Sequence, residues 1–97
     1  MSIQHGTITL HSDAPSALSP RTSGIGIVAA SLGYIAAMPD YVGYGDSSST
    51  FHPYQHASTL ASATVDMVRA ARKFLSLPTG SVTLNGQLFL TGYSEGG

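Results

Sequence analysis

The last ten residues place the strongest constraint on what this chain can fold into. The apolar run 88–91 predicts a buried parallel strand, and it ends in the pattern Gly92-x-Ser94-x-Gly96. A serine in this pattern occupies a tight turn between a strand and a helix, in a backbone conformation that costs about 1–3 kcal/mol. The two glycines lack the Cβ atoms that would collide as the chain closes around the turn. We therefore predict a strained turn that presents Ser94.

Acyl transfer would use both the side chain and the main chain of this turn. The hydroxyl of Ser94 would attack a carbonyl carbon. The main-chain N–H of Glu95 would point at the oxygen that becomes negative. The chain holds 11 glycines and many serines, so the same pattern could also be a plain turn after a strand. The function of the motif therefore depends on the residues upstream of it.

The composition indicates one small domain with few charges. Of the 97 residues, 42% are hydrophobic and 9% are charged. About a quarter is usual for charged residues in globular domains. Two explanations fit: a secreted protein, or a piece of a domain whose faces are covered by further chain. The net charge of −1 gives no reason to expect nucleic acid or an anionic membrane as a partner.

Cysteines, apolar segments and the N-terminus add three further limits. The chain has no cysteine, so we expect no disulfide and no thiol chemistry, and the compartment stays open. No apolar run approaches the roughly 18 residues of a transmembrane helix. Residues 1–5 lack the basic start and apolar core of a signal peptide. The localisation is therefore left undetermined.

Turn-forming residues divide the chain into alternating strands and helices. Ser23 is expected to cap the first helix and Gly33 to end it. Right-handed crossovers then make all strands parallel, which predicts an α/β domain with a parallel sheet and flanking helices. The expected elements are a strand end within residues 1–10, a loop over 11–23, a helix over 24–33, a strand over 34–38, a loop over 41–56, a helix over 57–77, a short extended stretch at 81–84 and a strand over 88–91.

The helix over 57–77 carries the clearest periodicity. Apolar and small residues recur at helical spacing and predict one buried face. Its members are Leu60, Thr64, Met67, Val68, Ala71 and Leu75.

Four pieces of sequence, taken together, resemble the α/β-hydrolase superfamily, and within it the secretory-lipase-type esterases and lipases of bacteria and fungi. They are His5-Gly6-Thr7, the stretch from Gly33-Tyr34 to Pro39-Asp40-Tyr41-x-Gly43-x-Gly45-Asp46-Ser47, His52-Pro53-Tyr54, and residues 88–97. These resemble the motif after the third strand, the fourth strand with its loop, a short motif before the next helix, and the fifth strand with its nucleophile elbow. The resemblance implies that residues 1–97 form a single partial α/β-hydrolase domain. In that domain the strand over 34–38 would lie on one side of the first strand and the strand over 88–91 on the other.

The resemblance also implies roles for individual residues. Ser94 would be the nucleophile, and the main-chain N–H groups of Thr7 and Glu95 would form the oxyanion hole. His5 would hold its own loop. Asp40 and Asp46 would organise the loop after the fourth strand. The implied substrate is a carboxylic ester, including lipid esters, and secretion or a periplasmic location would follow the family. No cofactor is implied.

The sequence departs from the family at its end. Members of the family continue past the elbow to a catalytic acid and then a histidine, in the order Ser, acid, His. The expected partner is therefore the remainder of a hydrolase chain, and the 97 residues alone are expected to be inactive. Two alternatives remain: a non-catalytic remnant or interaction subunit, and a serine peptidase of the same fold. Glu95 stands where the group often has Gln, and a surface carboxylate at a helix start is its simplest interpretation.

Other chemistry finds little support in the residues. A base other than the family histidine could come from His5, His11, His52 or His56. The simpler interpretation is that the loop histidines are solvated. A metal site built from His52 and His56 with Asp40 or Asp46 matches no compact ligand spacing, so no metal is predicted. Gly24-x-Gly26 lacks the third glycine of a dinucleotide motif.

Overall fold

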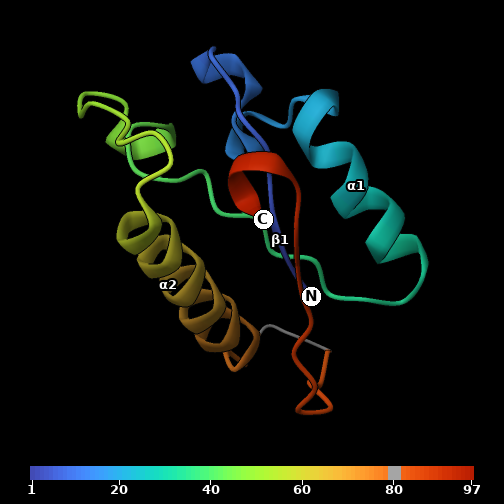
Figure 1. The fold of residues 1–97 in the computed structure, drawn as a ribbon. Coiled ribbons are helices and arrows are strands. Elements are labelled where there is room, and N and C mark those ends of the chain that lie inside the picture. Colours follow the sequence, from blue (N-terminus) through green and yellow to red (C-terminus); the bar gives the residue numbers. More distant parts are fainter. Residues whose placement is uncertain (79–81) are drawn as a thin grey trace.

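The computed structural model describes residues 1–78 and 82–97, and it is a small mixed α/β unit. Figure 1 shows two helices on opposite sides of a pair of strands, with the C-terminal turn at one end of the strands. Within the described residues, none of the helices is long and apolar enough to span a membrane. The elements are the strands β1 (Ser2–Gln4) and β2 (Leu90–Gly92), the helices α1 (Pro20–Ser31) and α2 (Ala57–Leu75), and 3₁₀ turns at His11–Asp13, Pro15–Ala17, Gly45–Ser47 and Ser94–Gly96.

The sheet is parallel and has β1 at its centre. β1 pairs with β2 in the register Ser2–Leu90 to Gln4–Gly92. On its other side β1 meets Ala37 in a single parallel bridge. The predicted spatial order of the three segments is therefore confirmed. The prediction of a full strand over 34–38 is wrong, because the described residues form only β1, β2 and this single bridge.

The short third segment has a physical cause. The N-terminal amine of Met1 donates to the Ile35 oxygen at 2.7 Å, and the Ala37 N–H donates to the Met1 oxygen at 2.9 Å. The Ile3 N–H then donates to the Ala37 oxygen at 2.9 Å. The next bond in this ladder would need an N–H at Pro39, and proline has none. The ladder stops there.

The first helix begins earlier than the sequence indicated. α1 starts at Pro20 with Ser19 at the N-cap position, so the prediction of a start at residue 24 capped by Ser23 is wrong. Proline is favoured at the first helical position because its missing N–H would have no partner there. Ser23 lies inside the helix and donates through its hydroxyl to the Ser19 oxygen at 2.7 Å. The loop predicted over 11–23 is therefore shorter, and it contains two 3₁₀ turns.

The end of α1 agrees with the prediction. Gly33 follows the C-cap Leu32 with φ of +90°. Its N–H donates to the Ala30 oxygen at 3.0 Å, and the N–H of Tyr34 donates to the Ala29 oxygen at 3.2 Å. These two bonds satisfy carbonyls that the helix end would otherwise leave free.

The second helix was predicted well. α2 ends at Leu75, two residues before the predicted end, and no residue on it is fully buried. Its half-buried residues include every member of the predicted apolar face: Thr59, Leu60, Ala63, Thr64, Met67, Val68, Ala71 and Leu75. The extended stretch predicted at 81–84 lies partly outside the described residues, and 82–84 form no strand.

The buried residues gather at the carboxyl ends of the strands. β1 is buried along its whole length, whereas β2 is exposed throughout. The prediction of a buried strand over 88–91 is therefore wrong in its burial, and β2 begins two residues later, at Leu90. Ile8, Ala14 and Tyr44 form the apolar cluster beyond β1, where the loop after β1 meets the loop over 41–56. The core of this chain therefore lies under the loops that surround the C-terminal turn.

Candidate functional site

The turn after β2 has the constrained backbone that the motif predicts. Ser94 has φ of +56°, a left-handed conformation that non-glycine residues seldom adopt. It begins the 3₁₀ turn Ser94–Gly96, and it is exposed. A Cβ atom at Gly92 would overlap the main-chain oxygen of Gly96, and one at Gly96 would overlap the main chain of Gln4. Both glycines are therefore required by close packing of main chain against main chain.

A second loop lies directly against this turn. A Cβ atom at Gly6 would come within 3.0 Å of the Tyr93 ring, 3.2 Å of the Tyr93 oxygen and 3.3 Å of the Ser94 Cβ. Glycine at this position lets the segment that carries Thr7 approach the serine. Thr7 and Ser94 line the same cleft, which has a volume of about 530 Å³. The Thr7 hydroxyl is 3.2 Å from the hydroxyl of Tyr54.

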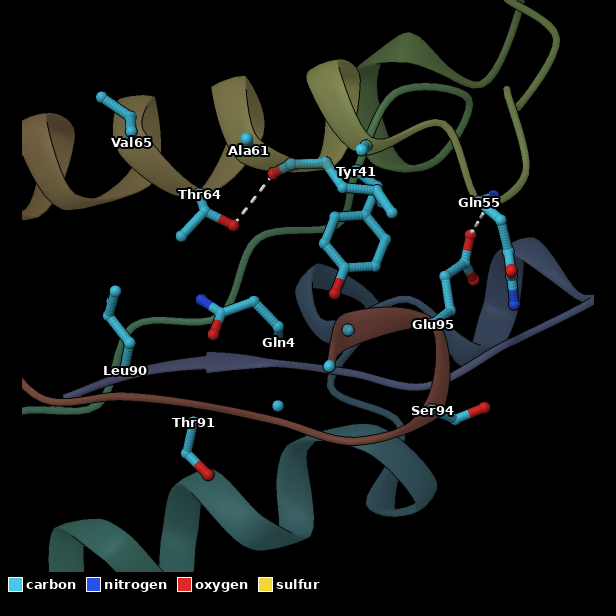
Figure 2. Close-up of a pocket in the computed structure, with 15 residues that line it drawn as sticks. Gln4, Tyr41, Gln55, Ala61, Thr64, Val65, Leu90, Thr91, Ser94 and Glu95 are labelled. Atoms are coloured by element: carbon cyan, nitrogen blue, oxygen red, sulfur yellow. Dashed lines mark hydrogen bonds between the residues drawn. The ribbon is translucent and has the colours of Figure 1, made fainter.

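Ser94 also borders a second cleft, on the other side of the turn. This cleft has a volume of about 660 Å³ and lies between β2, the turn and α2. In Figure 2, Gln4 and Leu90 line it from the strands, and Thr64 and Val65 line it from the helix. The serine thus stands at the boundary of two open clefts.

Two main-chain N–H groups at this site have no hydrogen-bond acceptor among the described residues. The hydrogen bonds among residues 1–78 and 82–97 include none from the N–H of Thr7 and none from the N–H of Glu95. These are the two groups that the resemblance assigns to an oxyanion hole. They are available to a ligand, and their catalytic role stays a prediction.

His5 holds the loop that carries Gly6 and Thr7. Its ring is buried, with Nδ1 2.7 Å from the Gly6 oxygen and Nε2 3.3 Å from the Asp40 oxygen. The Tyr41 ring lies 4.2 Å from it, centroid to centroid, and the Tyr41 hydroxyl donates to the His5 oxygen at 3.0 Å. The geometry agrees with the structural role predicted for His5.

The two aspartates of the following loop differ. The carboxylate of Asp40 accepts hydrogen bonds from the Ser16 N–H at 2.9 Å and from the Ser16 hydroxyl. It thereby joins the loop before α1 to the loop before α2, which is a structural task. Asp46 lies exposed in the turn Gly45–Ser47. The described ranges contain no group of three or more His, Cys, Asp or Glu side chains placed to hold a metal ion.

Glu95 is the largest departure from the sequence-based prediction. Its side chain is 1% exposed, so the expectation of a surface carboxylate is wrong. Oε1 lies 2.8 Å from Nε2 of His52 and accepts from the Gln55 N–H at 3.3 Å. Figure 2 shows this carboxylate pointing toward Gln55, while the Ser94 side chain points away from the turn.

His52 is correspondingly not a solvated loop histidine. Its side chain is 15% exposed, and its Nδ1 lies 2.7 Å from the Val42 oxygen. Both ring nitrogens are occupied, so His52 does not serve Ser94 as a base in this arrangement. The sequence hinted at it only through the motif His52-Pro53-Tyr54, because a contact between positions 43 residues apart leaves no local pattern.

The charge of Glu95 acts on two neighbouring tyrosines. Burial, and after it the Glu95 charge, raises the pKa of Tyr41 well above its usual value. The same two causes, in the same order, raise the pKa of Tyr44. The Tyr44 hydroxyl donates to the Ile8 oxygen at 2.6 Å. Both phenols therefore remain neutral hydrogen-bond donors around the site.

Comparison with known proteins gives one informative likeness. No protein-family model matches the chain, and no curated protein matches it. A crystal structure of a "putative hydrolase" from Legionella pneumophila is 40% identical, with a TM-score of 0.83 over 98% of this chain. The chain spans 25% of the length of that protein. The likeness supports a hydrolase-type fold for these residues.

Proposed function

We propose that this chain carries the nucleophile of a serine hydrolase that cleaves carboxylic esters through an acyl-enzyme, on a partial α/β-hydrolase fold of the secretory-lipase type. The observation that supports it most is the conformation of Ser94. A non-glycine residue with φ of +56° is exposed between two clefts and held there by glycines that no larger residue could replace. Strained residues of this kind concentrate at active sites. The likeness to the Legionella protein adds support for a hydrolase.

In this proposal the residues divide the work of acyl transfer. The Ser94 hydroxyl attacks the ester carbonyl carbon and forms a covalent ester, and the alcohol leaves with a proton. The free N–H groups of Thr7 and Glu95 bind the carbonyl oxygen as it becomes negative. Such donors act mainly in the transition state, and the loss of one costs roughly 10²- to 10³-fold in rate.

The base and the acid of the triad come from outside these residues. Among the described hydrogen bonds, no histidine contacts the Ser94 hydroxyl, and His52 faces Glu95 instead. We therefore expect the 97-residue chain alone to hydrolyse esters near background, because a serine without a base is a weak nucleophile. The remainder of a hydrolase chain would supply both groups.

The walls of the larger cleft favour an ester with an apolar group. Leu60 and Val65 of α2 and Leu90 of β2 contribute aliphatic side chains to it, and no lysine or arginine lines it. A lipid-like acyl chain could lie on such a surface. An amide substrate of the same shape distinguishes this proposal from a peptidase of the same fold, because a peptidase would cleave the amide and an esterase would not.

The test uses the full gene product that carries this sequence. A fluorophosphonate probe is expected to label Ser94, identified by peptide mass spectrometry. Ser94→Ala should abolish labelling and lower hydrolysis of p-nitrophenyl esters by roughly 10⁴-fold or more. Ser49→Ala, an exposed serine of the loop over 41–56, is the matched control and should keep both. Labelling elsewhere only, or esterase activity that survives Ser94→Ala, would contradict the proposal.

A further inference from the structure

His52 is fixed in place by the main chain around it. Its Nδ1 meets the Val42 oxygen at 2.7 Å and its Nε2 meets Oε1 of Glu95 at 2.8 Å. Gly43, with φ of +95°, allows this approach, because a Cβ there would come within 2.6 Å of the His52 Cα. The Tyr44 ring lies 4.8 Å away, centroid to centroid. These contacts together hold the His52 ring in this orientation.

The two contacts of the ring require a proton between His52 and Glu95. A carbonyl oxygen only accepts hydrogen bonds, so Nδ1 donates its proton to Val42. In a neutral ring Nε2 would then be an acceptor, and it faces a carboxylate, which also accepts. The 2.8 Å contact is satisfied only when one additional proton lies between Nε2 and Oε1.

The surroundings leave His52 as the partner of this carboxylate. The titratable groups around the pair are Tyr41, Tyr44 and Tyr54, and the His5 ring lies against Tyr41. In the described part of the chain, the ion pairs of arginine lie elsewhere, with Asp13 and Asp66. The raised pKa values of the two buried tyrosines keep those phenols uncharged.

We propose that His52 is a positioning residue, which holds the buried Glu95 carboxylate so that the main-chain N–H of Glu95 faces the oxyanion and the negative charge is turned away from it. The inference rests on the proposed function. The anchored side chain and the N–H belong to the same residue, next to the strained Ser94. A carboxylate free to swing toward the developing oxyanion would oppose it by charge repulsion. The link from His52 removes that freedom.

The kinetic test uses the full gene product and a p-nitrophenyl ester. His52→Ala should lower kcat roughly 10- to 100-fold with little change in KM, because the displaced N–H acts mainly in the transition state. His52→Gln, whose amide can still donate to the carboxylate, should recover most of that loss. His56→Ala is the control: its exposed ring bonds only to Ser58 and Thr59, and kcat should be unchanged. Equal kcat for wild type and His52→Ala would overturn the proposal.

A spectroscopic arm separates this inference from the proposed function. Two-bond ¹H–¹⁵N spectra of the wild type should show a His52 ring whose nitrogen shifts change in Glu95→Gln. Identical His52 nitrogen shifts in the two proteins would contradict the contact between His52 and Glu95. If Ser94→Ala remains active, the proposed function fails whatever the ring shows. If Ser94→Ala is inactive while His52→Ala equals wild type, only the positioning role fails.

Discussion

The two ends of this small molecule are built in different ways. At the carboxyl ends of the strands, loops bury His5, Tyr41, Tyr44 and Glu95 against one another. The helices and β2 are open by contrast, and large apolar side chains such as Ile27 and Phe74 are 68% and 69% exposed. This chain covers the loop end, and it leaves much of the apolar surface of the helices uncovered.

The difference shows which part of the fold is stabilised by contacts within this chain. Tyrosine hydroxyls and the Asp40 carboxylate cross-link the loop after β1 to the loop before α2 at the site end, so its geometry depends on residues in this chain. The faces of the helices depend on apolar burial, and they have too little to cover them. We expect the isolated chain to be marginally stable, oligomeric or held by another chain. A monomer with a cooperative thermal transition would contradict this.

The largest expected effect is at the tightest contact of the site end. Gly92→Ala should destabilise the protein by about 3 kcal/mol or more, because the added Cβ overlaps the Gly96 oxygen and neither main chain can retreat. The measurement is the urea midpoint of unfolding, together with fluorophosphonate labelling of Ser94, which should fall in parallel.

Gly24 of α1 provides the matched control for that substitution. A Cβ at Gly24 would meet nothing within 4 Å. Gly24→Ala is therefore expected to stabilise the helix by up to ~1 kcal/mol. Similar urea midpoints for the two variants would show that the turn at Ser94 is no more closely packed than a helix surface. They would contradict the difference between the two ends of the molecule.

A smaller effect is expected from one hydrogen bond across the loops. Tyr41→Phe leaves the His5 oxygen without its donor, which should cost about 1–2 kcal/mol. Tyr93→Phe, at a tyrosine that is 79% exposed, is the control and should change stability little. A cost for Tyr41→Phe no larger than for Tyr93→Phe would mean that the site end is not held by these cross-links.

The same tyrosine should make stability depend on alkaline pH. Its pKa is raised in the folded state, so above pH 10.0 the unfolded chain loses this proton while the folded one keeps it. The stability that Tyr41 contributes is complete below that pH and is lost as the pH rises further. The difference in unfolding free energy between wild type and Tyr41→Phe should narrow between about pH 9 and 11. A difference that widens would contradict the assignment.

The smallest effect is expected on the open faces. Ile27→Ser on α1 should change the stability of the 97-residue chain by no more than about 0.5 kcal/mol, since the side chain is already exposed. It should also reduce self-association, measured by sedimentation velocity. A loss above ~1 kcal/mol in the isolated chain would show that this face is covered there, and the contrast between the two ends would weaken.

Local patterns in the sequence predicted several elements well. The periodicity of α2, the terminating Gly33 and the glycines that flank Ser94 each depend on residues a few positions apart, where sequence spacing maps directly onto geometry. The start of α1 was missed because Pro20 was taken as a loop residue, although proline is equally suited to a first helical turn. The strand over 34–38 was overestimated because Pro39 ends its pairing.

The sequence by itself predicted a strained turn at Ser94 after a strand, because such a turn requires glycines at both flanking positions. Only the tertiary structure decided the surroundings of the turn. It buried Glu95 and joined it to His52, 43 positions earlier, and it brought Thr7 into the same cleft as Ser94. Contacts between distant segments depend on how loops pack over the strands, and no spacing along the chain records them.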